Sequence, residues 1–319
     1  MKALTWHGGP RLDYGDRPAP ETPPGAVALD IALAGVCGSD LHPYRGHHGP
    51  RTPPLVLGHE AVGSVAGDDG RYVVFPIVAC GACPACLRGE ENLCETRGLL
   101  GLDRQGVFAD TVAVDPAALT PIPAGVPDEV AVLTEPFACA VSALRYAGAA
   151  PGRRVLVLGG GPIGLLTVHA CAVRGIEVIA VEPVAGRRAL AQRLGAAAVA
   201  ASVDGLGAGQ VDIAIDAVGI EPTWQAAVAR VRAGGSVTVI GLGQAEGVVA
   251  VGDMVRRGIT MRGHYAYTRA DFDAALATLA EHPPGLEWLT VLPLSEGAEA
   301  FRRLVEEPEG TVKALLVPG

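Results

Sequence analysis

Four kinds of reactive side chain occur close together near the start of the chain. A thiol, a hydroxyl, a carboxylate and an imidazole lie within six positions, at Cys37, Ser39, Asp40 and His42. A second imidazole and a second carboxylate follow at His59 and Glu60. A soft thiolate with an imidazole suits zinc, and one or two carboxylate oxygens would leave a position open for water or substrate, as a catalytic zinc requires. Taken singly, each residue is better explained as a buried thiol, a surface histidine or a solvated charge, so the hypothesis depends on the set.

Four further cysteines form a second cluster, with two, two and seven residues between them: Cys80, Cys83, Cys86 and Cys94. Four thiolates close a tetrahedral shell, so this spacing predicts a structural zinc that orders a lobe over residues 78–96. An iron–sulfur cluster is the alternative, but the ferredoxin run closes with three intervening residues rather than seven. A metal-free thiol cluster on a polar loop would gain nothing by packing.

A glycine-rich segment follows a run of four aliphatic residues. Gly159, Gly161 and Gly164 fit the pattern G-x-G-x-x-G, with Pro162 and Ile163 between the last two. In a dinucleotide site the first glycine makes the tight turn, the second lets the backbone approach a pyrophosphate, and the third permits close packing of helix on strand. The helix that follows offers free N–H groups to the phosphates. The alternative is an ordinary strand–helix turn.

Glu182 ends the next apolar run, 18 residues beyond the last glycine of the pattern. An acid at roughly 20 residues is expected to hold the adenosine ribose diol. Its charge would repel a 2′-phosphate, so NAD is favoured over NADP. Arg187 and Arg188 lie just downstream and could meet such a phosphate. Glu182 alone could also be a solvated charge at the end of a strand.

The elements that must position these residues differ between the two parts of the chain. Residues 1–125 are rich in Gly and Pro and contain short apolar stretches, which predict β-strands at 26–33, 61–65 and 72–76. After a helical stretch at 128–147, helical segments separate β-branched runs at 155–158, 178–181, 211–215 and 236–240. This alternation predicts a parallel, doubly wound sheet. Helices at 271–282 and 295–306 and a strand at 311–317 are expected to follow.

The order of these motifs resembles a known family. Cys-Gly-Ser-Asp-x-His, then Gly-His-Glu, the four cysteines, Glu135-Pro136 and the glycine pattern are spaced as in the zinc-containing medium-chain dehydrogenases. The chain is most similar to their sorbitol/threonine dehydrogenase branch, which its C-terminal residues 309–318 also fit. The resemblance implies an α/β protein in three segments: a GroES-like β-rich catalytic domain (1–135), a Rossmann NAD-binding domain (136–264), and a return to the catalytic domain (265–319).

The resemblance also implies roles for the first cluster. Cys37 and His59 match the first two ligands of a catalytic zinc. Glu60 and Glu135 are both candidates to complete its shell, and the sequence does not rank them. Cys139 and Cys171 match no ligand position and are expected to be buried thiols.

Three neighbours of these ligands match residues of the proton path. Ser39 matches the hydroxyl that hydrogen-bonds the substrate oxygen. Asp40 matches the carboxylate that orients the ligand imidazole, and His42 matches the outer end of a proton relay.

The implied chemistry is hydride transfer between a secondary alcohol, such as a polyol, cyclitol or sugar, and NAD. The chain would hold two Zn²⁺ ions, one catalytic and one structural, and the catalytic ion would lower the pKa of the alcohol. Gly241 and His264 are expected near the nicotinamide, although a strand-end turn and a domain hinge would explain them as well. Candidate pocket residues are Tyr44, Arg45, His47, His48 and Phe137.

Composition limits the partners. The 319 residues are 49% hydrophobic and 18% charged, with a net charge of −9, which indicates two folded domains and no disorder. The absence of a basic block argues against nucleic acid, and no apolar run reaches the roughly 18 residues of a membrane helix. No signal-peptide pattern is present, so a soluble cytoplasmic protein is expected, and the resemblance implies a homodimer or homotetramer.

Two other functions stay open. One is an NADP-linked aldehyde or ketone reductase on the same scaffold, which cofactor preference would distinguish. The other is a non-catalytic family member, which would have no chemical need for the complete set of candidate site residues.

Overall fold

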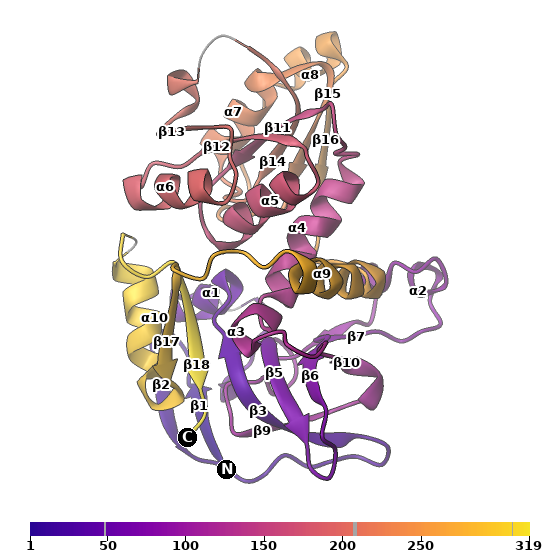
Figure 1. Ribbon diagram of the computed structural model, residues 1–319, viewed down its shortest axis with the longest axis vertical. Coiled ribbons are helices and arrows are strands. Elements are labelled where there is room, and N and C mark those ends of the chain that lie inside the picture. Colours follow the sequence, from indigo (N-terminus) through magenta and orange to yellow (C-terminus); the bar gives the residue numbers. More distant parts are fainter. Residues whose placement is uncertain (48, 207–208, 308) are drawn as a thin grey trace. The chain divides into compact units, whose positions relative to one another are not determined.

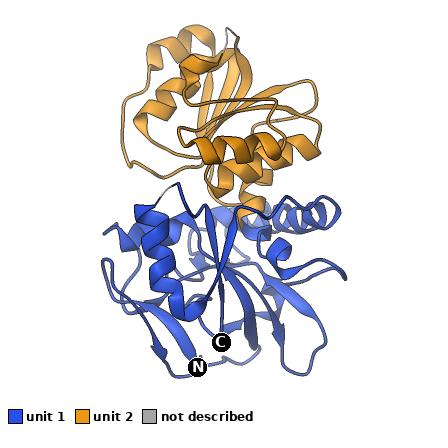
Figure 2. Ribbon diagram, turned by 60° about the vertical axis from the view of Figure 1, so that its left-hand side comes forward, with its two compact units in different colours: residues 1–135, 268–319 blue, residues 136–267 orange. Residues whose placement is uncertain are grey.

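The computed structural model describes residues 1–47, 49–206, 209–307 and 309–319, and its elements are shown in Figure 1. The chain forms two compact units, coloured separately in Figure 2. Unit 1 comprises residues 1–135 and 268–319, and unit 2 comprises residues 136–267. Two chain crossings therefore join the units, one within a helix and one at residues 267–268.

Unit 1 is built on a seven-stranded sheet. Its order is β10-β6-β5-β3-β18-β17, and β9 also pairs with β3. The strands are β3 (Val27–Gly35), β5 (Glu60–Val65), β6 (Arg71–Val74), β9 (Thr111–Val114), β10 (Leu119–Pro121), β17 (Leu289–Pro293) and β18 (Lys313–Val317). The predicted strands at 26–33, 61–65 and 72–76 correspond to β3, β5 and β6. Because β5, β3 and β18 are neighbours, segments far apart in the sequence meet in the middle of this sheet.

A smaller antiparallel sheet completes the core of unit 1. It has the order β2-β1-β4 and consists of β1 (Lys2–Trp6), β2 (Leu12–Asp16) and β4 (Leu55–Val56). Helix α10 (Gly297–Glu306) packs beside it, and Phe301 meets the ring of Phe108 edge-on with centroids 6.1 Å apart. Helix α9 (Arg269–Glu281) begins at Thr268, whose side chain accepts a hydrogen bond from the N–H of Asp271. This capping box fixes the start of the helix.

The predicted helix at 128–147 is wrong as a single element. The structure has two helices there, α3 (Asp128–Ala131) and α4 (Thr134–Tyr146). Pro136 has no N–H to donate to a preceding carbonyl, so it is tolerated only in the first turn of a helix. The Thr134 hydroxyl instead donates to the Ala131 carbonyl at 2.7 Å, which joins the two helices.

Unit 2 contains a six-stranded sheet whose strands all pair in parallel, as predicted. Its order is β13-β12-β11-β14-β15-β16. The strands are β11 (Arg154–Leu158), β12 (Glu177–Val181), β13 (Ala198–Ala200), β14 (Val211–Asp216), β15 (Val231–Val239) and β16 (Thr260–Gly263). The edge strands β13 and β16 were not expected from the sequence, because β13 is short and β16 contains polar residues.

The helices of unit 2 cover both faces of this sheet. Helices α5 (Pro162–Val173) and α6 (Ala185–Arg193) pack on β11, β12 and β13, and α7 (Glu221–Arg230) packs on β14 and β15. The short helix α8 (Val251–Arg257) precedes β16. Right-handed crossovers that run in opposite directions from the centre place their helices on opposite faces. The strand order therefore reverses between β11 and β14, which is where such sheets bind ligands.

Candidate active site and metal centres

Cys37 and Asp40 occupy the turn that follows β3. The strand ends at Gly35, and the chain then enters a single 3₁₀ turn, Gly38–Asp40, and the short helix α1 (Leu41–Tyr44). Cys37 is extended at the start of this turn, and its N–H donates to Asp40 Oδ2 at 3.1 Å. This hydrogen bond ties the backbone of Cys37 to a fully buried carboxylate.

His59 and Glu60 stand at the start of the neighbouring strand β5, and both are buried. One ligand atom each from Cys37, His59 and Glu60 lies within 4.8 Å of the other two. His59 Nδ1 lies 3.6 Å from Asp40 Oδ1, so its other ring nitrogen remains for a metal. The structure thus brings together three of the residues that the sequence predicts as catalytic-zinc ligands.

The electrostatics of this set are dominated by burial and by opposite charges. Burial opposes ionisation of His59, but the charges of Asp40 and Cys37 outweigh it and raise the pKa of His59 well above its usual value. For Asp40, burial raises the pKa, but the charge and hydrogen bond of His59, the charge of Arg51 and the N–H of Cys37 together lower it more, so the net shift is downward. A metal ligand must be a neutral imidazole, so a metal bound here displaces a proton.

An unpaired atom tests whether the set fits a metal. Glu60 Oε1 is a buried polar atom without a hydrogen-bond partner among the described residues. Buried polar atoms of this kind are rare unless an ion, a water or a ligand partners them. A thiol, an imidazole and a carboxylate are also the donors that zinc takes in open sites. The residues present therefore fit a zinc ion.

Glu135, Ser39 and His42 surround the set differently. Glu135 is buried in the first turn of α4 and is not among the three groups within 4.8 Å. Ser39 is half-buried in the 3₁₀ turn, and His42 is half-buried in α1. Partial burial and then the nearby cations Arg51 and Arg45 lower the pKa of His42. A neutral His42 can accept a proton, as a relay requires.

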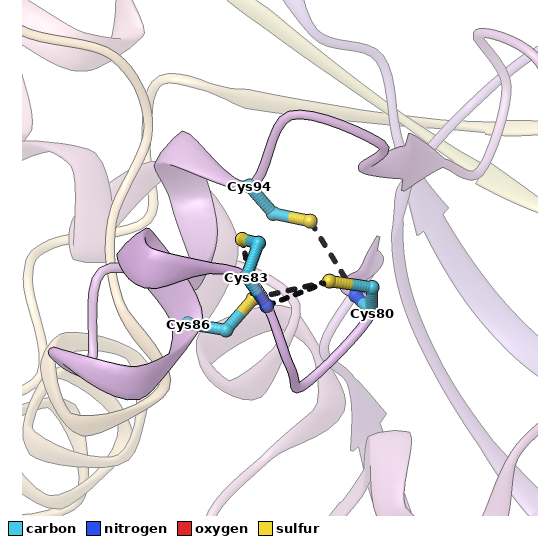
Figure 3. Close-up of side chains that lie close together, drawn as sticks. All are labelled: Cys80, Cys83, Cys86 and Cys94. Atoms are coloured by element: carbon cyan, nitrogen blue, oxygen red, sulfur yellow. Dashed lines mark hydrogen bonds between the residues drawn. The ribbon is translucent and has the colours of Figure 1, made fainter.

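The four-cysteine cluster forms a lobe beside β7 (Ile77–Val78) and β8 (Gly98–Leu99), with helix α2 (Pro84–Leu87) inside it. Figure 3 shows the four side chains pointing toward one another, and all four sulfurs lie within 4.8 Å. Cys83 Sγ is 3.5 Å from Cys86 Sγ, and Cys80 Sγ is 3.9 Å from Cys86 Sγ. Zinc–sulfur bonds of about 2.3 Å give a tetrahedral edge of about 3.8 Å, so these spacings fit one ion.

The thiols of the lobe also need a cation. Backbone N–H donors lower the pKa of Cys80 and Cys94, whereas burial and neighbouring thiols raise the pKa of Cys86 to about 12. Four thiolates cannot all ionise together without a counter-charge, and a divalent metal supplies it. All seven cysteines are free thiols. Outside the two clusters, Cys171 is buried as expected, but Cys139 is only partly buried.

A hydrogen bond joins the lobe to helix α9. The Glu91 carboxylate, between Cys86 and Cys94, accepts a hydrogen bond from the N–H of Arg269 at the start of α9. Carboxylates at helix N-termini satisfy free N–H groups and oppose the helix dipole. Order in the lobe therefore supports α9.

The glycine pattern forms the turn between β11 and α5, at the point where the strand order reverses. A Cβ at Gly164 would lie 1.8 Å from the Gly159 carbonyl oxygen, so only glycine fits there. A Cβ at Gly161 would meet no atom of the described residues within 4 Å. Gly161 precedes Pro162 and Ile163 at the start of α5, so this open face lies at a helix N-terminus. The turn fits a dinucleotide pyrophosphate.

Glu182 lies directly against this turn. Its carboxylate accepts hydrogen bonds from the N–H of Gly160 at 2.6 Å and from the N–H of Val184 at 2.8 Å. Arg188 donates to the Glu182 carbonyl at 2.8 Å, whereas the Arg187 Nε is buried without a partner among the described residues. The predicted ribose acid is therefore beside the predicted phosphate turn, and Arg187 is the arginine with a free donor.

The turns after β14 and β15 are joined by Asp216, a residue that the sequence analysis does not predict as functional. Asp216 ends β14, is fully buried, and accepts hydrogen bonds from the N–H of Val218 at 2.9 Å and of Gly219 at 3.1 Å. The Gly241 N–H in turn donates to the Asp216 carbonyl at 3.0 Å. An acid at the carboxyl end of a buried strand was the available signal. His264 follows β16 and packs on Tyr146 in a tilted arrangement, with ring centroids 4.9 Å apart.

Two functional candidates in unit 1 were also missed. Lys313, at the start of β18, is fully buried and pairs with Glu60. Arg51 is buried near Asp40 and His42. Among the proposed pocket residues, Tyr44 packs on Phe301, Phe137 packs on His169, and Arg45 and His47 are exposed. His48 lies outside the described residues.

With this geometry in place, comparison with known proteins gives the class. The sequence matches two family models, described as Alcohol dehydrogenase GroES-like domain over residues 23–124 and Zinc-binding dehydrogenase over residues 162–281. The 2-dehydro-3-deoxy-L-galactonate 5-dehydrogenase of Pseudoalteromonas atlantica is 30% identical over 92% of this chain and 91% of its own. The sorbitol dehydrogenase of Halalkalibacterium halodurans is 30% identical over 100% of this chain and 99% of its own.

Solved structures agree with this assignment. A protein described as a short chain alcohol dehydrogenase from Escherichia coli, complexed with NADH, has a TM-score of 0.90 at 26% identity over 99% of both chains. A zinc-binding dehydrogenase from Sinorhizobium meliloti, bound to NADP, has a TM-score of 0.90 at 29% identity over 99% of both chains.

The chain therefore belongs to the zinc-binding alcohol dehydrogenase family, with its GroES-like and Rossmann folds, which confirms the resemblance seen in the sequence. It is an oxidoreductase, and the solved structures reported above hold NADH or NADP. Within the described residues, no helix combines the length and the apolar character needed to cross a bilayer.

Proposed function

We propose that this protein is an NAD-dependent dehydrogenase of secondary alcohols in polyols or sugar acids, with unit 1 as its catalytic domain and unit 2 as its cofactor domain. The set of half-buried Cys37 with buried His59 and Glu60 carries the proposal, because its donors fit an open zinc site and Glu60 retains an unpaired oxygen. The substrate class rests on the names of the relatives, a sugar-acid dehydrogenase and a sorbitol dehydrogenase.

Each side chain of the site has a distinct task. Cys37 and His59 would hold a zinc ion, with Glu60 or Glu135 completing the shell, and the ion would act as a Lewis acid toward the alcohol oxygen. Asp40 orients the imidazole through its contact with Nδ1. The Ser39 hydroxyl receives the alcohol proton and passes it outward, and His42, whose pKa is lowered by burial and by arginines, accepts it.

Unit 2 would hold the dinucleotide at the turns after β11 and β14. Glu182 supports NAD because its carboxylate would repel a 2′-phosphate. Arg187 has a buried Nε without a partner among the described residues, and this observation favours the second candidate, an NADP-linked ketone or aldehyde reductase. A second zinc in the four-cysteine lobe would be structural, because four thiolates leave no open position.

The proposal extends to assembly and location. Strand β16 is an edge of the six-stranded sheet, and four aliphatic side chains in unit 2 are exposed: Leu242, Val248, Val251 and Val255. Exposed apolar surface beside a sheet edge supports a homodimer or homotetramer formed through unit 2. The free thiols support a reducing, cytoplasmic location.

The test is reduced-cofactor formation by the zinc-loaded protein. Polyols, cyclitols, aldonates, threonine and simple secondary alcohols are each offered with NAD and with NADP. Turnover of a polyol or an aldonate with NAD is the expected result. Turnover with NADP alone would instead indicate that Arg187 binds the 2′-phosphate of NADP. A protein that holds zinc and NAD but turns over none of these alcohols would contradict the proposal.

A further inference from the structure

A buried lysine stands behind the candidate catalytic metal site. Lys313 Nζ donates to Glu60 Oε2 and, at 3.0 Å, to the carbonyl oxygen of Val36. Both side chains of the ion pair are 0% exposed. Val36 precedes Cys37, and Glu60 follows His59. One ammonium therefore links the two segments that carry the thiol and the imidazole.

The fold makes room for this ion pair. Gly35 on β3 is the direct partner of Glu60 on β5, and it also pairs with Leu315 on β18. A Cβ at Gly35 would lie 2.1 Å from Glu60 Oε2, so a glycine is required for the carboxylate to lie over β3. The Glu60 carboxylate thus occupies the space left by Gly35 on β3 and is held there by Lys313 on β18.

The identity of the cation is itself informative. Of the 25 lysine and arginine residues in the chain, only Lys2 and Lys313 are lysines. Lysine is therefore rare in this chain, and one of its two lysines occupies this buried position. An ammonium is a compact point charge with freely directed donors, whereas a guanidinium is a broad planar fork. The pocket bounded by Val36, Glu60 and Gly35 calls for the smaller group.

The charges around the ammonium complete the argument. Lys313 Nζ contacts a Glu60 oxygen, and Glu60 and Cys37 present ligand atoms within 4.8 Å of one another. Asp40, which is fully buried, contacts His59 in the same set. The ammonium therefore belongs to a largely buried cluster with three groups that are anionic when ionised: Cys37, Glu60 and Asp40. A divalent metal would supply two positive charges against these three negative ones, and Lys313 supplies the third. Buried charges are tolerated only when they are compensated in this way.

We infer that Lys313 is a positioning residue of the metal centre: it holds Glu60 by one oxygen and neutralises the excess negative charge of the ligand set. The inference rests on the proposed zinc site. Loss of the Lys313 charge should therefore raise the zinc affinity and lower the turnover. Removing the ammonium leaves a more negative site that binds a divalent cation more tightly. The same uncompensated charge on Glu60 repels the negative oxygen that develops on the substrate, so turnover falls.

The experiment compares Lys313→Met with the wild type in two measurements: zinc affinity by competition with a chelator, and kcat with NAD. We expect zinc at the Cys37 site to be held about tenfold more tightly, because one repelling charge is removed. We expect kcat to fall by about 10- to 100-fold, the usual range for residues that support metal ligands. Zinc in the four-cysteine lobe serves as the internal reference. Lys2→Met is the matched control, because Lys2 is exposed and pairs with Asp16 at 2.9 Å, and neither quantity should change.

Loss of both zinc affinity and turnover in a folded Lys313→Met protein would show a merely structural lysine and overturn the inference, as would no change in either. If this variant does not fold, Glu60→Gln is compared with the double variant Glu60→Gln/Lys313→Met. The double variant should bind zinc about tenfold more tightly than Glu60→Gln; equal affinity would overturn the inference. The proposed function fails separately, if His59→Ala retains as much zinc as the wild type.

Discussion

The two candidate metal sites of unit 1 are built in opposite ways. The four-cysteine lobe takes all of its ligands from residues 80–94, and three of its four thiols are at least partly exposed. The catalytic candidate takes Cys37 from the end of β3 and His59 and Glu60 from the start of β5, where His59 and Glu60 are buried. The ligands of the lobe are close together in the sequence and mostly exposed to solvent. The ligands of the catalytic candidate are brought together by the pairing of two strands.

This difference separates what a metal would do in each place. The lobe has little apolar content, so its order depends on the ion. The sheet already fixes the catalytic set through strand pairing and through the Asp40 and Lys313 contacts. Loss of metal should therefore unfold the lobe but leave the catalytic set in place without activity. The predictions below test this contrast, beginning with the largest effect.

Replacement of a catalytic ligand should abolish turnover without unfolding the protein. His59→Ala removes the buried imidazole beside Cys37 and Asp40, and we expect kcat/KM to fall by more than about 100-fold, the upper range for residues that merely support a ligand. One zinc per chain should be lost, while NAD binding survives because the glycine turn lies in unit 2. Steady-state kinetics, metal counting and cofactor titration measure the three quantities.

His169→Ala is the matched control for this substitution. His169 is also a buried histidine, but it lies in α5 of unit 2, where it packs on Phe137 with ring centroids 5.8 Å apart. The control should keep both zinc ions. Full activity in His59→Ala would contradict the proposal that His59 is a ligand of a catalytic metal site.

Replacement of a lobe ligand should have the opposite profile. Cys80→Ser removes an exposed thiol, so no cavity forms and any loss of stability reports the metal. We expect one zinc per chain to be lost, the lobe to become sensitive to protease, and kcat to fall less than about tenfold, because a closed shell offers no substrate position. Cys171→Ala, at a buried thiol outside both clusters, should leave the zinc count unchanged. A loss of activity as large as that of His59→Ala would contradict the division between the two sites.

The cofactor turn offers a third, smaller test. Glu182→Ala removes the carboxylate that accepts the Gly160 and Val184 N–H groups. KM for NAD should rise about tenfold, as expected for the loss of charged hydrogen bonds of about 1.5 kcal/mol, while KM for NADP should change little. Glu177→Ala, at the other end of β12, is the control, since Glu177 pairs with Arg154 on the surface. Equal losses for the two cofactors would remove the ribose assignment.

The contrast between the sites also explains what the sequence could predict. The cysteine lobe and the glycine turn lie within short segments, so spacing alone indicated them. Parallel strands were visible as β-branched runs. The Lys313–Glu60 pair, 253 residues apart, was not visible, because no local pattern joins β18 to β5.

The remaining errors have local causes. The break before Thr134 depends on one missing N–H at Pro136 within an alanine-rich run. The role of Asp216 depends on hydrogen bonds to a turn that composition does not reveal. The family resemblance named both Glu60 and Glu135 as candidate zinc ligands. Lys313, distant from both in the sequence, pairs with Glu60, so the structure distinguishes the surroundings of the two carboxylates.

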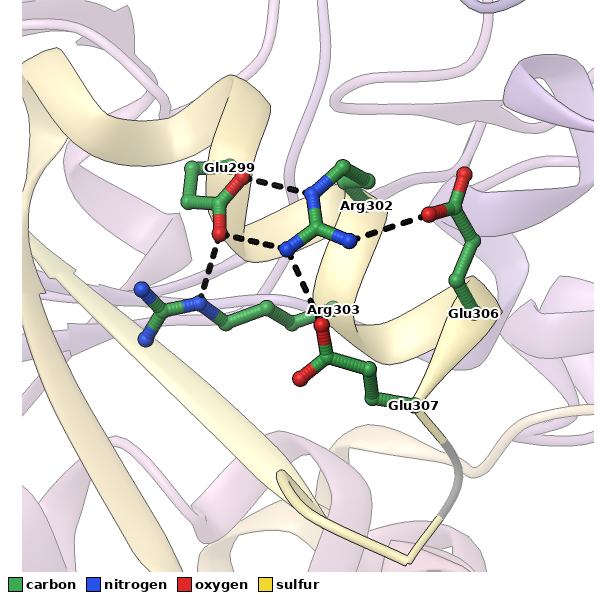
Figure 4. A network of polar contacts seen from close by, with 5 residues as sticks. All are labelled: Glu299, Arg302, Arg303, Glu306 and Glu307. Atoms are coloured by element: carbon green, nitrogen blue, oxygen red, sulfur yellow. Dashed lines mark hydrogen bonds and ion pairs between the residues drawn. The ribbon is translucent and has the colours of Figure 1, made fainter.

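The smallest effect is expected where charges are exposed and no metal is involved, on helix α10. Figure 4 shows Glu299 bonded to Arg302 and Arg303, while Glu306 and Glu307 also contact Arg302.

Hydrogen bonds from Arg302 and Arg303 lower the pKa of Glu299 from 4.5 to about 2. A carboxyl with a lowered pKa in the folded state stabilises the protein above its unfolded pKa, and this contribution is lost as the pH falls from 4.5 toward 2. Glu299→Gln should therefore lower Tm by only about 2 °C at neutral pH, since solvent screens exposed pairs, and the difference should shrink below pH 4.5. Paired thermal melts against Glu281→Gln, at an exposed glutamate of α9, measure it. A shift as large as that of Cys80→Ser would mean that exposed ion pairs, rather than buried charge and metal, hold unit 1 together.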